Sequence, residues 1–304
     1  MKRLETISFI VDKVTICSWF CRLFMIDQAL PTLNDWITVF TRAAIPVLPA
    51  SVAELAEMRA MEDARGDVDA HMLSQNLGGD PLMTLKVLMQ VSQDCHRRHI
   101  SSPETLTSAI LMQGIGPFFR SNENVPSVIN WLADYPEALS GLLKVIKRAR
   151  RAAHLAVTFA SHRQDEDADM LQEAALLHDF AEMLLWCHAP LLALTIAQRQ
   201  RADHTLRSAD VQKEVLGIEL TDLAHALMQA WQLPELLIKN TDDRNAEHPR
   251  VKTVLLAVRI ARHTQYGWDD PHAQAALPDD IADVAQLLTL SDESAKRKIM
   301  EIDS

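Results

Sequence analysis

The stretch EAALLHDFAEMLL, residues 173–185, is the most informative part of this 304-residue chain. Its apolar residues recur at the three- and four-residue spacing of a helix, and no glycine or proline interrupts them. His178 and Asp179 stand in the middle, between Leu177 and Phe180. Polar side chains in so apolar a helix need partners, because an unpaired polar group in a protein interior costs free energy. The stretch therefore predicts a helix that carries a candidate polar site.

Helical patterns dominate the rest of the chain as well. The sequence contains only 8 Gly, and 48% of its residues are hydrophobic. The longest pattern runs from Pro136 to about Arg163, and Asp80 with Pro81 forms a helix start of the N-cap type. Ser51 with Glu54 resembles a capping box at the start of another helix. We therefore predict an all-α fold, a two-lobed bundle of many helices.

The helical pattern also suggests how the chain is organised. We expect one main domain, formed by two lobes that share a long helix, with an extension before it and a helical tail after it. The predicted segments are an N-terminal extension at 1–33, a domain at 34–270 with lobes at 34–130 and 131–270, and a C-terminal helical tail at 271–304.

The first residues are a poor signal peptide, because Asp12 and Lys13 split the apolar region and no small-residue cleavage site follows. Two interpretations stay open: a fraying amphipathic helix, or an overextended start of translation with Met25 as the true first residue. We favour the second. An N-terminal peptide beginning at Met1 in a mass spectrum of the native protein would refute it.

Charge and cysteine content exclude several classes of protein. The 30 basic and 41 acidic residues give a net charge of −11, which opposes general binding to nucleic acid. No stretch reads as a membrane span, since a spanning helix needs about 20 apolar residues. The four cysteines are scattered, which is typical of reduced thiols in the cytoplasm: Cys17, Cys21, Cys95 and Cys187.

His154, His178 and Asp179 are candidate metal ligands. Metal-assisted phosphate hydrolysis needs imidazole and carboxylate ligands and an open position for water. His154 lies in the long helix, and the other two lie in the next one, from about Asp167 to Trp186. The side chains of adjacent helical residues point about 100° apart. His178 and Asp179 can therefore bind the same metal ion only if it sits in a wedge between helices. In the plainer interpretation, His178 packs in the core and Asp179 bonds a neighbouring helix.

Several segments resemble a known family. The stretch at 173–185 resembles the HD-superfamily helix that reads Leu-Leu-His-Asp-Ile-Gly-Lys. The segments Ile45–Pro49 and Asp80–Met83 look like the start of the bacterial HD-related output domain (HDOD), and Ala230–Pro234 matches its Trp-x-Leu-Pro segment. The resemblance covers about residues 36–265. It implies an all-α fold and a role in bacterial signalling.

The chain departs from that family where further metal ligands are common. It has Glu219-Leu220 where the family commonly has Asp-His, and Arg244-Asn245, after Asp242-Asp243, where a His-His pair often stands. Arg262 stands where the last Asp ligand is expected, and its permanent positive charge opposes a divalent cation. We therefore expect no cofactor; the alternative is a divalent metal such as Fe, Mn or Zn.

A basic run precedes His154. Its members are Lys144, Lys147, Arg148, Arg150 and Arg151. A solvated helix face explains such a run well, and a phosphate or nucleotide site is the alternative, because Arg binds phosphate oxygens with a bidentate fork. Arg148 and Arg151, together with Arg262, are our candidate ligand-binding residues.

The sequence thus leads to three functional hypotheses. The first is a non-catalytic cytoplasmic regulator that binds a protein partner in a signalling pathway, or a small ligand. The alternative is a metal-dependent phosphohydrolase acting on a nucleotide or cyclic dinucleotide, with His154, His178 and Asp179 as its ligands. The third is a sensor pocket in which Arg262 pairs with an anionic group. The identity of the partner does not follow from the sequence.

Overall fold

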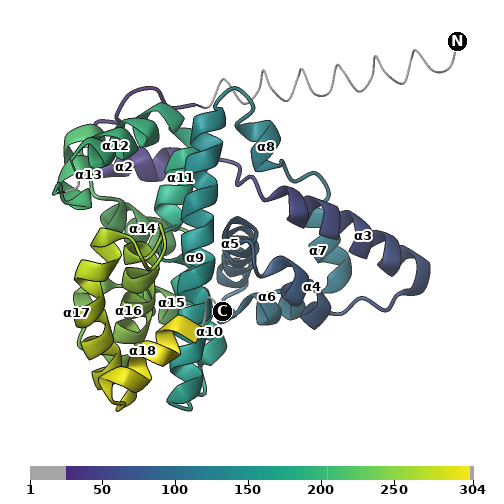
Figure 1. Ribbon diagram of the computed structural model, residues 1–304. Coiled ribbons are helices and arrows are strands. Elements are labelled where there is room, and N and C mark those ends of the chain that lie inside the picture. Colours follow the sequence, from purple (N-terminus) through teal and green to yellow (C-terminus); the bar gives the residue numbers. More distant parts are fainter. Residues whose placement is uncertain (1–24, 204, 302–304) are drawn as a thin grey trace, which may run out of the picture.

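The computed structural model describes residues 25–203 and 205–301. In that part of the chain every regular element is a helix, and the one extended pairing is a parallel bridge between Val47 and Ser127. Figure 1 shows two groups of helices on either side of the long helix α9. The prediction of an all-α, two-lobed bundle is confirmed. The predicted translation start at Met25 concerns residues 1–24, which lie outside the described part of the chain.

The first lobe is built around α5. Asp80 begins this helix as predicted, because its Oδ1 accepts the backbone N–H groups of Leu82 and Met83. Its Oδ2 accepts the N–H of Leu48 and the hydroxyl of Ser51, each at 2.7 Å. The helices are α3 (Pro49–Arg65), α4 (Ala70–Leu77), α5 (Pro81–Arg97), α6 (Leu106–Gln113) and α7 (Ile115–Ser121).

The capping box predicted at Ser51 and Glu54 is wrong. Helix α3 begins two residues earlier, at Pro49, whose fixed φ suits the first helical position. Ser51 is already inside the helix, and its hydroxyl donates to Asp80 instead of capping. The start of α3 has no side-chain cap of its own.

Helix α9 (Pro136–His162) connects the lobes and matches the predicted bounds closely. Its 27 residues make it roughly 40 Å long at 1.5 Å per residue. Two shorter helices, α10 (Ala168–Leu177) and α11 (Phe180–His188), pack along it.

The single helix predicted from Asp167 to Trp186 is therefore divided. The break falls at Asp179, whose φ of −96° and ψ of 22° leave the helical region. An unbroken helix would turn two adjacent side chains about 100° apart. The break lets His178 and Asp179 face the same cavity, where each finds partners on other elements.

The second lobe contains the remaining helices. They are α12 (Pro190–Ala202), α13 (Ser208–Leu216), α14 (Leu220–Ala230), α15 (Glu235–Asn240), the 3-10 turn η1 (Asp243–Asn245), α16 (Pro249–His263), α17 (Pro271–Leu288) and α18 (Asp292–Met300). Arg259 of α16 binds Asp280 and Asp283 of α17, at 2.8 and 2.5 Å. The residues predicted as a tail are thus packed onto this lobe.

Two short helices also sit on the second lobe although they precede it in sequence. Helix α2 (Leu33–Phe40) packs against α14, and Phe40 lies against the ring of His188. Trp131 of α8 (Val128–Trp131) donates its indole N–H to the carbonyl of Cys187 at 2.9 Å. The chain therefore leaves the second lobe after α2, forms the first lobe, and returns at α8.

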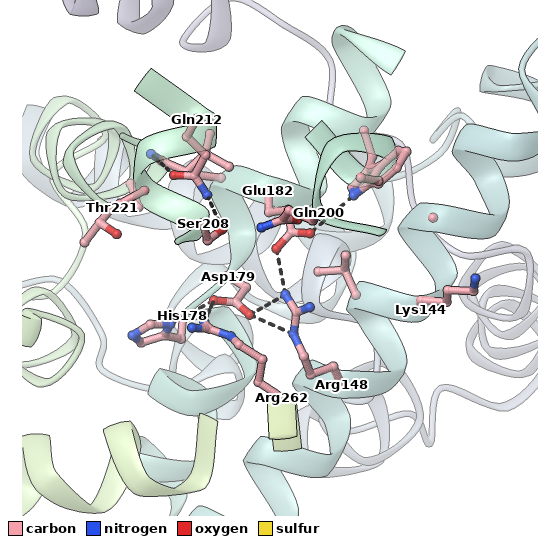
Figure 2. A pocket seen from close by; sticks show the side chains of 18 of the residues that line it. Lys144, Arg148, His178, Asp179, Glu182, Gln200, Ser208, Gln212, Thr221 and Arg262 are labelled. Atoms are coloured by element: carbon pink, nitrogen blue, oxygen red, sulfur yellow. Dashed lines mark hydrogen bonds and ion pairs between the residues drawn. The ribbon is translucent and has the colours of Figure 1, made fainter. Parts of the chain in front are cut away.

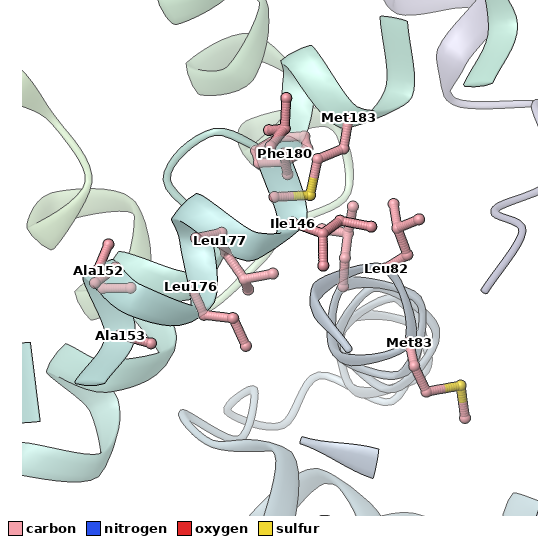
Figure 3. Close-up of a cluster of buried hydrophobic side chains, with 14 of the residues drawn as sticks. Leu82, Met83, Ile146, Ala152, Ala153, Leu176, Leu177, Phe180 and Met183 are labelled. Atoms are coloured by element: carbon pink, nitrogen blue, oxygen red, sulfur yellow. The ribbon is translucent and has the colours of Figure 1, made fainter. Parts of the chain in front are cut away.

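The core lies where α5 meets α9, α10 and α11. Figure 3 shows Leu82 of α5 beside Ile146 of α9, with Leu177 nearby, while Met83 points to the other side of α5. All four are at most 2% exposed. Full burial of one such side chain contributes roughly 1.5–3 kcal/mol. This packing fixes the position of the α10–α11 break against α9.

Among the described helices, none alone is long and apolar enough to cross a lipid bilayer. The run Ala168–His188 passes that test only together with Pro190–Ala202, across a bend of 117°.

Candidate functional site

A cavity of about 820 Å³ opens at the break between α10 and α11. Its walls come from α9, α12, α13, α14, η1 and α16, which bring together residues far apart in sequence. Figure 2 shows Arg148 next to Asp179 and Glu182, with His178 and Arg262 on the other side of Asp179. His178 and Asp179 thus both line this cavity.

Arg148 forms the centre of the site. Its Nη2 lies 2.7 Å from Asp179 Oδ2 and 2.6 Å from Glu182 Oε2, and its Nε lies 3.1 Å from the same Asp179 oxygen. Its side chain is only 10% exposed. Burial alone would lower the pKa of Arg148, but the charges of Glu182 and Asp179 raise it above its usual value. The guanidinium is therefore a fixed cation between two carboxylates.

His178 is held between two carboxylates as well. Its Nδ1 is 3.0 Å from Asp179 Oδ1, and its Nε2 is 2.9 Å from Asp243 Oδ1 on η1. Burial would lower the pKa of His178, but the hydrogen bonds and charges of both acids raise it to about 9. The imidazole is thus protonated at neutral pH, and both of its nitrogens donate. A protonated ring has no lone pair to offer a metal.

Arg262 is the outermost cation of the group. Its Nη2 is 3.4 Å from Asp179 Oδ1, and half of its side chain is exposed. Burial would raise the pKa of Asp179, but the charges of Arg148 and Arg262 hold it well below its usual range. Asp179 therefore stays ionised and already has three cationic partners.

His154 lies apart from this group. It is exposed on another face of α9 and lines a separate groove beside Leu48 and Pro49. Six residues separate it from Arg148, which corresponds to roughly 240° around the helix axis. Thus Arg148, and not His154, faces Asp179, and the expected trio of His154, His178 and Asp179 does not assemble.

The residues of the cavity do not fit a divalent cation. Within the described chain no three His, Cys, Asp or Glu side chains are grouped so that they could hold a metal ion. Asp179 faces the guanidinium groups of Arg148 and Arg262, and His178 is occupied by two carboxylates. A metal would have to displace these partners and overcome the repulsion of two permanent cations.

The candidate ligand-binding arginines are divided between two places. Arg148 and Arg262 line the cavity. Arg151 points to the groove that holds His154; its Nη1 donates to the carbonyl of Thr264 at 3.0 Å, and its guanidinium lies 5.4 Å from the centre of the Trp268 ring. Arg151 is therefore not part of the cavity.

Two residues of the site were not singled out from the sequence. Glu182 lies four residues after His178, one helical turn along the same stretch, and this spacing was the available signal. Asp243 belongs to the Asp242-Asp243 pair that precedes the replaced His-His segment. Its contact with His178 joins residues 65 positions apart, which no local pattern reveals.

Comparisons with known proteins agree with this architecture. The sequence profile of the HDOD domain matches residues 45–247, about two thirds of the chain. The chain belongs to the HDOD family. The resemblance to this branch of the HD superfamily is thus confirmed.

Two solved structures show the same fold. The MmoQ response regulator from Methylococcus capsulatus is 18% identical, with a TM-score of 0.60 over 84% of this chain and 98% of that one. A virulence factor, cj0248, from Campylobacter jejuni is 17% identical, with a TM-score of 0.62 over 88% and 97%. No curated protein matches the sequence. At these identities the similarity concerns the fold.

Proposed function

We propose that this HDOD protein is a non-catalytic signal-transduction regulator of the bacterial cytoplasm. It works by binding a protein partner, or a small ligand, on a scaffold whose metal site has been replaced. The observation that carries the proposal is Arg148, whose guanidinium lies 2.7 Å from Asp179 and 2.6 Å from Glu182. A side chain of the protein supplies the positive charge that a metal would bring.

The energetic argument favours a permanent replacement. Arginine does not lose its proton in a protein, so Arg148 cannot become neutral to admit a cation. Separating one partner from a buried ion pair costs about 3–5 kcal/mol, because the other charge remains buried without compensation. A divalent ion would have to supply this energy before it could bind.

The phosphohydrolase alternative lacks support from the geometry. It requires His154, His178 and Asp179 around one ion, whereas His154 lies in a different groove.

The small-ligand form of the proposal has one observation in its favour. Arg262 is half exposed and only 3.4 Å from an already neutralised Asp179, so it is available to an anionic group in the cavity.

Metal analysis and phosphoester turnover test the proposal together. We expect protein purified from medium supplemented with Fe, Mn and Zn to contain no stoichiometric metal and to leave nucleotides and cyclic dinucleotides intact. Stoichiometric metal that is lost in His178→Ala, with turnover that is lost in parallel, would overturn it. His154→Ala is the control, because His154 belongs to the predicted trio but lies outside the cavity that holds His178 and Asp179.

Two further measurements distinguish the forms of the regulator. A pull-down from the native cell, read by mass spectrometry, should enrich a signalling protein if a partner is bound. If the cavity binds an anion, a nucleotide panel should raise the melting temperature, and Arg262→Ala should remove that increase.

A further inference from the structure

A second hollow, of about 580 Å³, lies between the start of α3 and the face of α9 that carries Leu143 to His154. We call it the α9 groove. Helix α9 contributes positions 143, 147, 150 and 154, which the three- and four-residue spacing places in one row. The row runs over 12 residues, from 143 to 154, which corresponds to roughly 16 Å along the helix axis. It is an open, elongated surface, separate from the cavity around Arg148.

Every ionisable side chain that lines the α9 groove is basic: Lys147, Arg150, Arg151 and His154. This is unusual for a chain of net charge −11. Arg150 and Arg151 are anchored by the carbonyls of Gly79 and Thr264. The side chains of Lys147 and His154 are exposed, and neither has a hydrogen bond or ion pair within residues 25–203 and 205–301.

The groove also has an apolar component. Leu143 is 44% exposed at one end, and Leu48, Pro49 and Ile146 form the floor. The groove combines basic side chains with an apolar floor. Such a surface matches a segment that presents apolar and acidic residues side by side. An amphipathic helix does so at its own i, i+3 and i+4 positions.

The start of α3 adds to the positive character. Ala50 lines the groove at the second position of this 17-residue helix, which has no side-chain cap. The positive end of the helix dipole therefore faces the groove. Asp80 lies behind it, but its carboxylate is buried and used by Leu48, Ser51 and the start of α5.

We propose that the α9 groove docks an acidic amphipathic helix of a partner protein. This inference rests on the proposed function, in which the protein acts through a partner. Charge argues against a second copy as the occupant, because two chains of −11 repel each other. The open shape argues against a small ligand, which usually has most of its surface buried in its site.

The test uses synthetic helical peptides and fluorescence anisotropy. The probe is a peptide of about 16 residues with Leu on one face and Glu flanking it. We expect binding that weakens with added salt, because the ion pairs are exposed and screened. A peptide in which Lys replaces every Glu should not bind, and one in which Ser replaces every Leu should bind more weakly.

Matched variants locate the binding site. Lys147→Glu should weaken binding about tenfold or more, whereas Lys296→Glu, the same charge change on α18, should stay within about twofold. Leu143→Asp should also weaken it about tenfold, and Leu191→Asp, at an equally exposed position, should not. The two leucines are 44% and 45% exposed, so their variants should both fold.

Each other outcome overturns the proposal. Equal binding to the groove variants and to their controls would place the peptide elsewhere. A dimer in analytical ultracentrifugation that Lys147→Glu dissociates would make a second copy the occupant. Thermal stabilisation by inorganic phosphate, lost in Lys147→Glu without any peptide binding, would indicate a small-anion site. Metal or turnover in the central cavity would instead contradict the proposed function, whatever the groove binds.

Discussion

Arg148 shows how one side chain can supply the positive charge at the centre of a site. It reaches Asp179 and Glu182 from α9 at 2.7 and 2.6 Å, and all three side chains are at most 32% exposed. Its five N–H donors are arranged in a planar fork, so one residue can satisfy two carboxylates. One guanidinium thus gives the two acidic side chains beside His178 a shared cationic partner.

The Arg148→Ala variant measures the importance of this cation. We expect the free energy of unfolding to fall by about 3–5 kcal/mol, because both carboxylates lose their buried partner. Urea denaturation checks this. The control is Arg98→Ala, at an exposed position, which should change stability by less than about 0.5 kcal/mol. A loss for Arg148→Ala as small as that of the control would mean that the ion pair contributes nothing to the fold.

At the scale of elements, the α10–α11 break depends on how α11 packs against α9. Trp186 of α11 lies against Gly141 of α9, and its ring atoms would be 2.5–2.7 Å from a Cβ added there. Only glycine permits this approach. The contact sets the distance between the helix that supplies Arg148 and the helix that begins after Asp179.

Gly141→Ala tests this approach of the two helices. Alanine in a helix interior normally stabilises by about 1 kcal/mol relative to glycine. Here the clash with a rigid, buried indole ring should dominate and destabilise the protein by about 1–3 kcal/mol. Thermal and urea unfolding provide the measurement. Gly116→Ala is the control, since its added Cβ meets only the end of the Arg120 side chain at 3.4 Å; a stabilised Gly141→Ala would refute the argument.

The contact of His178, at the α10–α11 break, with Asp243 of η1 should make stability depend on pH. The pKa of His178 rises from 6.5 to about 9 because Asp179 and Asp243 outweigh the effect of burial. The folded state therefore binds more protons than the unfolded state between these values. This contribution is complete below about pH 6.5 and is lost as pH rises through about 9.

His178→Gln isolates that contribution. The wild-type protein should lose on the order of 1–3 kcal/mol more than the variant between pH 6 and about 9.5. Urea denaturation at each pH gives the difference between the two curves. Curves that run parallel over this range would show that the imidazole is not held as a cation.

At the scale of the whole molecule, a buried carboxyl group links the two lobes. Glu173 of α10 accepts the N–H of Leu106, at the start of α6, at 2.7 Å. Its other oxygen is buried and has no partner among the described residues. Burial, together with Asp169, raises the pKa of Glu173 from 4.5 to about 8, although the Leu106 bond opposes the shift.

Glu173→Gln tests this link between the lobes. Because the folded state keeps the proton, wild-type stability should fall as pH rises from about 4.5 through about 8. Glutamine keeps an acceptor for Leu106 and carries no charge, so the variant should equal the wild type near pH 4 and be more stable by about 1–3 kcal/mol at pH 8.5. A variant less stable at every pH would indicate that the carboxylate, not the acid, is the native form.

The amino-acid pattern alone was enough to predict the helices and the polar pair that marks the site. Apolar spacing predicted α9 to within one residue, Asp80 and Pro81 predicted the start of α5, and the stretch at 173–185 singled out His178 and Asp179 as candidate site residues. The helices and their starts depend on residues close together in the chain, where propensity, capping and periodicity act.

Tertiary structure decided which charged groups meet. Arg148 rather than His154 faces Asp179, because the position of Asp179 depends on how α11 crosses α9 and on the break that precedes it. Asp243 reaches His178 across 65 residues, and the basic face of α9 becomes a groove only where α3 begins beside it. Such contacts follow from the packing of whole helices, so a local sequence pattern does not predict them.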